Sequence, residues 1–321
     1  MRKLQGVILD LDSMGPTSLD LSCLLNIADV EWQVFNATSV DQTAQRIAQA
    51  DIVLTNKAVL NREVITHATQ LRYVGVLATG VNNIDLDACE QANITVKNVS
   101  QYGTASVAQH TLMLMLMMAT SARHYDEAVK HGAWQQSEQF CLLNFPIIEL
   151  AGKHLVIVGY GTLGRAVAKL AEAFDMRVTV ALRPGDERPE TQGRRPALDD
   201  VLPRADFVSL HCALSDDTAH MINAERLALM RSSAILINTA RGGLVDEDAL
   251  LTALQQKYIA GAALDVVSSE PPSQSTAIVN AKLPNLLITP HVAWAAVEAR
   301  QRLLHIAASH LLQFLDRLET T

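Results

Sequence analysis

The stretch Leu155–Leu170, LVIVGYGTLGRAVAKL, constrains the fold of this chain more than any other segment. Its first four residues are apolar and rich in β-branched side chains, which predicts a buried parallel strand. Gly159, Gly161 and Gly164 then form the pattern G-x-G-x-x-G, and a helical pattern follows over Arg165–Phe174. In such a unit the glycines permit a tight turn and close packing, and the helix N-terminus attracts the pyrophosphate of a dinucleotide. The alternative is an ordinary glycine-rich connection between a strand and a helix.

This turn begins only in the middle of a 321-residue chain, a length that suits two domains. Strand-like and helix-like segments alternate on both sides of it, which predicts parallel, doubly wound sheets. The expected strands lie first in GVILDL, ADIVLTN, LRYVGVLATG and ITVKNV, and later in RVTVAL, DFVSLH, AILINTA, GAALDV and NLLITP. Long helical patterns cover residues 104–131 and 294–315.

The central position of the nucleotide turn predicts that one domain is inserted in the other. We expect an α/β fold with a Rossmann dinucleotide-binding domain at residues 101–291. A flavodoxin-like substrate domain would consist of residues 1–100 and 292–321. Ligand pockets commonly lie between such domains, so we expect the active site there.

Composition excludes several other classes of protein. The net charge of −8, with no basic stripe, argues against nucleic acid as a partner. Cys23, Cys89, Cys141 and Cys212 form no C-x-x-C pair, which predicts free thiols in a reducing cytoplasm and no metal site. The N-terminus shows no signal-peptide pattern, and the apolar run Thr111–Ala122 is too short to span a bilayer. We therefore expect a cytoplasmic protein that binds no membrane.

Four later motifs occur in a fixed order: HCALSDDTAHMIN, AILINTARGGLVDEDAL, GAALDVVSSEPP and NLLITPHVAW. Together they resemble the D-isomer-specific 2-hydroxyacid dehydrogenase family, and the resemblance covers nearly the whole chain. ADIVLTNKAVL, YVGVLATGVNNID and YGTASVAQHTLMLML are most similar to its glycerate dehydrogenase/hydroxypyruvate reductase branch. The resemblance implies an oxidoreductase that transfers a hydride between NAD(P)H and a small 2-keto acid such as hydroxypyruvate or glyoxylate.

The same resemblance implies three catalytic residues: Arg241, Glu270 and His291. Their chemistry suits the reaction, because a guanidinium matches a carboxylate and can polarise the adjacent carbonyl. An imidazole titrates near neutral pH and can give a proton to the forming alkoxide. Glu270 would orient that imidazole and favour its charged form. Each could instead be structural: a surface arginine, a charge in a turn, and a hydrogen-bonded histidine.

The glycine pattern and the resemblance together assign the cofactor contacts. NAD-binding Rossmann domains place an acid after the second strand to bind the ribose 2′-hydroxyl. Here Leu182 stands at that place and Arg183 follows, with Asp186 and Glu187 only later and Arg188 close behind. We therefore favour NADP over NAD, because an arginine can pair with a 2′-phosphate; Arg183 could instead stack on adenine or face solvent. The expected contacts are Thr104, Gly159, Gly161, Thr162, Leu163, Gly164, Arg183, His211, Cys212, Ala213, Thr218, Thr239, Ala240 and Asp265.

The first domain is expected to hold the substrate carboxylate. Backbone N–H groups of Ala78, Thr79, Gly80 and Val81 could form an anion nest, and Asn56 could face the same cleft. The alternative is a plain βα connection.

Two further functions and one assembly stay open on the sequence. A formate dehydrogenase is disfavoured, because that family carries Gln where Glu270 stands. An NAD(P)-binding sensor or corepressor on the same fold could keep all three catalytic residues. The family also implies a homodimer, with a contact through the Met-rich face of Thr111–Met118, although a monomer with that helix buried fits equally well.

Overall fold

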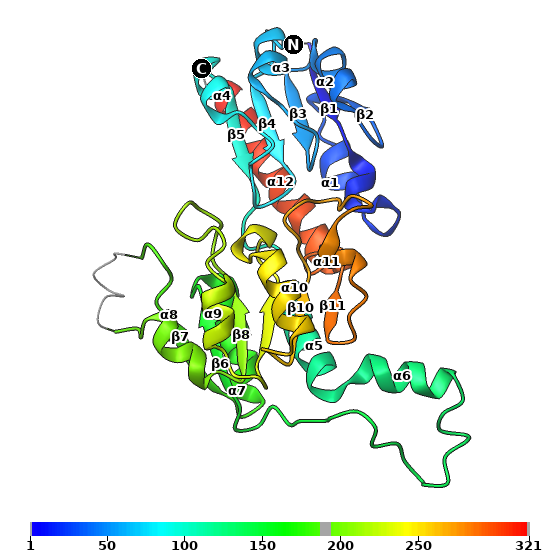
Figure 1. Ribbon diagram of the computed structural model, residues 1–321. Helices are drawn as coiled ribbons and strands as arrows, with labels where there is room; N and C mark the ends of the chain where they lie inside the picture. Colours follow the sequence, from blue (N-terminus) through cyan, green and yellow to red (C-terminus); the bar gives the residue numbers. More distant parts are fainter. Residues whose placement is uncertain (1, 187–193, 320–321) are drawn as a thin grey trace. The chain divides into compact units, whose positions relative to one another are not determined.

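The computed structural model describes residues 2–186 and 194–319 (Figure 1). Two compact units are present, one formed by Met1–Gly103 and Ala295–Thr321 and the other by the continuous segment Thr104–Trp294. Each unit has its own parallel sheet with apolar cores packed against it. No helix in the described part of the chain is long and apolar enough to span a bilayer.

The first unit contains a five-stranded parallel sheet in the order β2-β1-β3-β4-β5, which is the flavodoxin order. Its strands are β1 (Leu4–Ile8), β2 (Val30–Val34), β3 (Ile52–Thr55), β4 (Tyr73–Val76) and β5 (Thr95–Asn98). The connecting helices are α1 (Ser22–Leu25), α2 (Val40–Ile47), α3 (Arg62–His67) and α4 (Leu86–Gln91), with 3-10 turns at Leu11–Met14 and Pro16–Ser18.

The last helix of the chain, α12 (Val297–Glu319), completes this first unit. It packs on β4, β5 and α1, and Leu303, Leu304 and Leu311 on it are fully buried. Tyr73 of β4 and Phe314 of α12 have ring centroids 4.9 Å apart. The observed helix begins three residues later and ends four residues later than the 294–315 pattern predicts.

The second unit contains a six-stranded parallel sheet in the order β11-β10-β9-β8-β6-β7. Its strands are β6 (His154–Val158), β7 (Arg177–Ala181), β8 (Phe207–Leu210), β9 (Ile235–Asn238), β10 (Gly261–Leu264) and β11 (Leu286–Ile288). The helices that connect them are α7 (Thr162–Ala173), α8 (Leu198–Val201), α9 (Ala224–Leu229), α10 (Glu247–Gln255) and α11 (Ala277–Asn280). The chain reverses direction across the sheet between β6 and β8, so the carboxyl ends of these two strands form the switch point at which ligands bind in such sheets.

The helix predicted over residues 104–131 is broken in two. α5 (Thr104–Thr120) ends at Ser121, which has a left-handed φ of +51°, and α6 (Ala122–Lys130) begins directly after it. The Ser121 hydroxyl donates to the Pro146 carbonyl at 2.7 Å. A tertiary contact therefore accompanies the break, at a residue that is neither glycine nor proline.

The Met-rich face of α5 packs against the core of its own unit, which is the arrangement that the alternative of a buried helix predicts, and the subunit contact stays a prediction. Leu114 and Met115 are completely buried in the core between α5, α7 and the sheet, and Met113 and Met118 pack against that core. These side chains are used within their own unit.

Candidate active site

Three neighbouring strands of the second unit end in register at one edge of the sheet. Asn238 of β9 pairs with Leu264 of β10, which pairs with Ile288 of β11. The predicted catalytic residues follow these ends: Arg241 and His291 three residues after β9 and β11, and Glu270 six residues after β10. All three therefore follow strand ends at the carboxyl edge, where parallel sheets bind their ligands.

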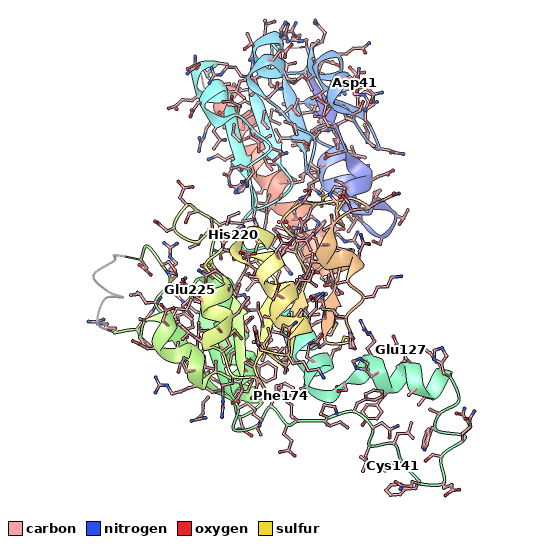
Figure 2. The ribbon with its side chains drawn as sticks, viewed as in Figure 1. Asp41, Glu127, Cys141, Phe174, His220 and Glu225 are labelled. Atoms are coloured by element: carbon pink, nitrogen blue, oxygen red, sulfur yellow. The ribbon has the colours of Figure 1, made fainter. Side chains whose placement is uncertain are left out.

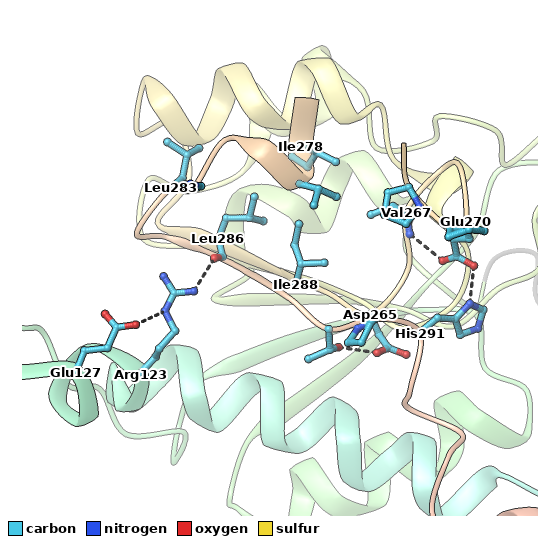
Figure 3. A pocket seen from close by; sticks show the side chains of 16 residues that line it. Arg123, Glu127, Asp265, Val267, Glu270, Ile278, Leu283, Leu286, Ile288 and His291 are labelled. Carbon is cyan, nitrogen blue, oxygen red and sulfur yellow. Dashed lines mark hydrogen bonds and ion pairs between the residues drawn. The ribbon is translucent and has the colours of Figure 1, made fainter. Parts of the chain in front are cut away.

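His291 and Glu270 form a hydrogen-bonded dyad (Figure 3). The Nδ1 atom of His291 lies 2.6 Å from Oε2 of Glu270, and about a third of each side chain is exposed. The other oxygen of Glu270, Oε1, accepts a hydrogen bond from the Val267 N–H at 3.0 Å. Glu270 is thus fixed by its own loop and orients the His291 ring. Because Glu270 occupies Nδ1, Nε2 is the ring nitrogen that can contact a substrate.

The backbone at His291 is strained and held on both sides. Its φ of +53° lies in the left-handed region, which costs about 1–3 kcal/mol for a residue other than glycine. The His291 N–H donates to the Asp265 carbonyl at 2.8 Å, and the His291 carbonyl accepts from Nε1 of Trp294 at 2.9 Å. These bonds hold the ring in place despite the strain.

Asp265 is a buried carboxylate that fastens the segment after His291. Its two oxygens accept from the N–H groups of Val292 at 3.0 Å and Ala293 at 2.8 Å. Burial alone raises the pKa of the Asp265 carboxyl, but hydrogen bonds from two side chains and two backbone groups outweigh it and lower that pKa. Asp265 is therefore ionised at neutral pH and acts as an acceptor only.

The Arg241 turn packs directly on the Glu270 loop. Asn238 closes this turn by accepting from the Ala240 N–H and donating to the Arg241 carbonyl, at 3.0 and 2.8 Å. A Cβ atom on Gly242 would lie 2.0 Å from the carbonyl carbon of Val267, so only glycine fits here. Arg241 itself is exposed, and its Nη1 donates to the Ala240 carbonyl at 2.7 Å.

A cavity of about 680 Å³ opens beside the dyad (Figure 3). Asp265, Glu270 and His291 line one part of it, and Arg241 does not line it. Most of the remaining wall is apolar, with Ile278, Leu283, Leu286 and Ile288 among its side chains. The dyad therefore borders space for a ligand within the second unit alone.

The three glycines of the nucleotide turn have separate structural roles. Gly159 has a φ of +95°, and a Cβ there would lie 2.6 Å from backbone atoms of His211 and Cys212. On Gly164, a Cβ would lie 2.1 Å from the Gly159 carbonyl oxygen, so its absence lets α7 pack on the turn. A Cβ on Gly161 would meet nothing within 4 Å, which leaves room for a phosphate at the start of α7.

A second pocket, of about 430 Å³, lies at the switch point between β6 and β8 and carries excess positive charge. Arg165, Arg183 and Arg195 line it, and among the described residues that line it Asp186 alone carries a carboxylate. The guanidinium carbons of Arg165 and Arg195 lie 5.6 and 5.7 Å from the centre of the Tyr160 ring. Asp186 is buried and lies 4.0 Å from Nε of Arg183. This pocket therefore fits the anionic groups of a dinucleotide. Arg188, which follows Arg183 in the sequence, lies outside the described residues.

Three of the other predicted cofactor residues line this pocket: His211, Cys212 and Ala213. Burial lowers the pKa of His211 to about 4, so its imidazole is neutral at pH 7. Nε2 of His211 pairs with the Ser209 hydroxyl at 2.8 Å, and within the described residues its Nδ1 has no partner. A hydrogen bond from a ligand would satisfy this buried atom.

Thr218 does not support the phosphate contact predicted for it. The residue is completely buried, and its hydroxyl donates to the Ala213 carbonyl at 2.8 Å and accepts from the Ser215 N–H at 2.8 Å. Its hydroxyl is thus occupied inside its own turn. The other predicted residues lie at the first turn of α7 (Thr162, Leu163), at the start of α5 (Thr104) and after β9 (Thr239, Ala240).

The predicted substrate loop follows β4 in the first unit. In this loop the carbonyl groups of Ala78, Thr79 and Val81 accept hydrogen bonds from the protein itself. The N–H groups of residues 78–81 have no hydrogen-bond partner within the described residues, which leaves them available to an anion. Asn56 is buried, and its side chain donates to the Ser13 hydroxyl at 3.0 Å, so it supports the neighbouring loop.

Sequence patterns did not reveal four features of the second unit: the cavity itself, Arg165 and Arg195 in the cofactor pocket, and His110 of α5, which lies 3.4 Å from Asp265. Arg195 lies in a charged loop that gives no positional signal, and His110 is one of ten histidines. Within the described part of the chain, no group of three or more potential metal ligands occurs.

Comparison with known proteins agrees with this geometry. Residues 112–293 match the family model described as D-isomer specific 2-hydroxyacid dehydrogenase, NAD binding domain. The chain is 37% identical over 311 residues to a hydroxypyruvate reductase of Blautia hydrogenotrophica, covering 96% of each chain. It is 40% identical over 272 residues to a glycerate dehydrogenase of Methylorubrum extorquens, covering 84% of this chain and 85% of that protein. A solved acyclic imino acid reductase, in complex with NADPH and D-Arg, superposes with a TM-score of 0.84 at 26% identity and covers 98% of each chain.

Proposed function

Since the chain belongs to the D-isomer-specific 2-hydroxyacid dehydrogenase family, we propose that it reduces a small 2-keto acid, hydroxypyruvate or glyoxylate, with a nicotinamide cofactor. The observation that carries this proposal is the His291–Glu270 dyad, in which Nδ1 and Oε2 lie 2.6 Å apart. The strands that precede His291, Glu270 and Arg241 pair in register. Relatives named hydroxypyruvate reductase and glycerate dehydrogenase support the substrate class.

The proposed roles follow from the chemistry of the three side chains. The bound cofactor supplies a hydride to C2 of the keto acid. Arg241 binds the substrate carboxylate and polarises the carbonyl. As the C=O electron pair moves to oxygen, Nε2 of His291 gives that oxygen its proton and returns to neutral imidazole, while Glu270 keeps the ring oriented. The N–H groups of residues 78–81 are proposed to bind the substrate carboxylate as well.

The test is the initial rate of absorbance loss at the cofactor band with hydroxypyruvate and with glyoxylate. We expect turnover by the wild type and a loss of at least about a hundredfold in His291→Gln, because general acid catalysis contributes that much. His67→Gln, at an exposed position on α3, serves as the matched control. A protein that binds the cofactor but reduces no 2-keto acid would contradict the proposal and favour the sensor function.

We further propose that NADPH is the preferred cofactor. Leu182 stands where an NAD-binding acid is expected, and the described residues that line the pocket include three arginines and one carboxylate. Asp186 neutralises part of the charge of Arg183, and Arg165 and Arg195 leave a net positive field for a 2′-phosphate.

The preference is tested by comparing NADPH and NADH in wild type and Arg183→Ala. A charge-assisted hydrogen bond contributes about 1.5–3 kcal/mol, so we expect kcat/KM with NADPH to fall by roughly tenfold to a hundredfold. The value with NADH should change little. Arg204→Ala, at an exposed arginine outside the pocket, is the control. Wild type that turns over faster with NADH would refute the preference.

We also propose that the protein is a homodimer that assembles through the segment after α6, within the cytoplasm. This segment belongs to the second unit but extends away from its sheet past Cys141 (Figure 2), and it exposes large apolar side chains. Phe140 is 91% exposed and Leu143 is 76% exposed, which is unusual without a partner. Light scattering should give twice 34.9 kDa for wild type and a lower mass for Phe140→Asp, with Phe174→Asp, at the residue directly after α7, unchanged. A monomeric wild type at micromolar concentration would refute the dimer.

A further inference from the structure

Helix α5 carries two consecutive side chains that reach the loops of the candidate active site. Nε2 of His110 lies 3.0 Å from the Thr289 hydroxyl and 3.4 Å from Oδ1 of Asp265. The hydroxyl of the next residue, Thr111, lies 3.0 Å from that of Thr239 in the turn before Arg241. The roles proposed above for the reaction do not use His110.

The directions of the hydrogen bonds around Thr289 follow from the charge of Asp265. Asp265 is ionised and can only accept, so the single hydroxyl proton of Thr289 goes to Asp265 Oδ1, 2.5 Å away. The Thr289 oxygen must then accept from His110, which requires the proton of the ring to be on Nε2. His110 is therefore a donor to Thr289, its Nε2 lies 3.4 Å from Oδ1 of Asp265, and its side chain is only 14% exposed.

These bonds lead from α5 to His291. Thr289 lies two residues before His291, and Asp265 holds the two residues after it through Val292 and Ala293. The carbonyl of Asp265 also accepts the His291 N–H. His110 thus fixes the groups that hold a histidine in a left-handed conformation.

We propose that His110 is a positioning residue for proton transfer by His291. It donates to Thr289, which in turn donates to Asp265, and so keeps the 289–293 segment in the one conformation that places the His291 ring against Glu270. This inference rests on the proposed reductase function for its kinetic consequence, but its structural consequence is independent of turnover.

The test compares wild type with His110→Leu, His110→Gln and the control His67→Leu. A catalytic group misplaced by about 1 Å can cost a hundredfold, so we expect kcat of His110→Leu to fall by about tenfold to a hundredfold. The solvent isotope effect on kcat should rise, because proton transfer becomes the slower step, while the Kd for NADPH and the melting temperature stay close to wild type. His110→Gln keeps an N–H donor at the end of the side chain and should recover most of kcat.

Imidazole nitrogen NMR gives an answer that does not depend on turnover. The His291 signals should shift or broaden in His110→Leu and stay at the wild-type positions in His67→Leu. Unchanged His291 signals, or a kcat of His110→Leu within about twofold of wild type, would overturn the positioning role. An inactive wild type with perturbed His291 signals in His110→Leu would instead refute the proposed function and keep the positioning role.

Discussion

Gly242 and Gly243 differ by one position and offer a sharp test of how the Arg241 turn is held. A Cβ on Gly242 would lie 2.0 Å from the Val267 carbonyl carbon, 2.2 Å from its oxygen and 2.3 Å from the Ser268 nitrogen. All three are backbone atoms that cannot rotate away. A Cβ on Gly243 would first meet the end of the Leu214 side chain at 3.0 Å, which can move aside.

The magnitude follows from these distances. Carbon atoms in contact normally lie about 3.5–4.0 Å apart, so Gly242→Ala must separate the Arg241 turn from the Glu270 loop by more than about 1 Å. A displacement of that size can cost about a hundredfold in rate, or about 2.7 kcal/mol of transition-state stabilisation. Overpacking should also lower the free energy of unfolding by about 1–3 kcal/mol.

The assay is steady-state reduction of hydroxypyruvate by NADPH, with thermal unfolding measured in parallel. We expect kcat/KM of Gly242→Ala to fall by about a hundredfold and that of Gly243→Ala to stay within about threefold of wild type. NADPH binding should survive in both variants, because neither glycine lines the cofactor pocket. A Gly242→Ala protein with wild-type kcat/KM would refute the idea that this contact sets the distance between Arg241 and Glu270.

Three further predictions follow from the same geometry. Glu270→Gln should lower kcat by about a hundredfold without weakening NADPH binding, as measured by single-turnover kinetics and cofactor fluorescence; equal losses in both would contradict its orienting role. Gly161→Ala should keep the wild-type melting temperature, because its Cβ would meet nothing within 4 Å, but should weaken NADPH in titrations; unchanged affinity would place the phosphates elsewhere. Burial lowers the pKa of His211 to about 4, below its unfolded value of about 6.5, so on acidification the unfolded state takes up a proton that the folded state does not. Stability should therefore fall by up to about 2 kcal/mol between pH 7 and pH 5 in denaturant titrations, and His211→Gln should reduce this fall.

The fold class was predictable because strands buried on both faces leave continuous apolar runs, such as Leu155–Val158 and Ile235–Ile237. The strand β2 was not predicted. It lies at the edge of its sheet, and its sequence VEWQV alternates apolar and polar residues instead of forming the continuous apolar run that marks the buried strands. Only Val30 of this strand is buried. The break at Ser121 carries no signal in the local sequence, because it goes with a contact to Pro146 that is distant in sequence.

In the candidate site, too, some features were predictable from the sequence and others were not. The motifs carrying Arg241, Glu270 and His291 gave the residues, and strand register explains why they follow neighbouring strand ends at one edge of the sheet. The contacts that hold these residues in place could not be predicted from the sequence. The hydrogen bond from His110 to Thr289 and the close packing of Gly242 on Val267 both join segments far apart in the chain. Thr218 is the opposite case. Its place in the motif suggests a phosphate contact, but its hydroxyl donates to the Ala213 carbonyl within its own turn.

The position of α12 has a consequence for how the protein is completed on the ribosome. The first unit needs Leu303, Leu304 and Leu311 of this helix to cover its sheet, yet they are translated only after the whole of the second unit. The second unit is one continuous segment and has its whole sequence once Trp294 has emerged. Because domains fold as units during synthesis, the part of the molecule that is translated first acquires its finished core last. Chains stalled at Trp294 and exposed to protease should therefore lose residues 1–103 while residues 104–294 survive, and equal survival of both would contradict this order.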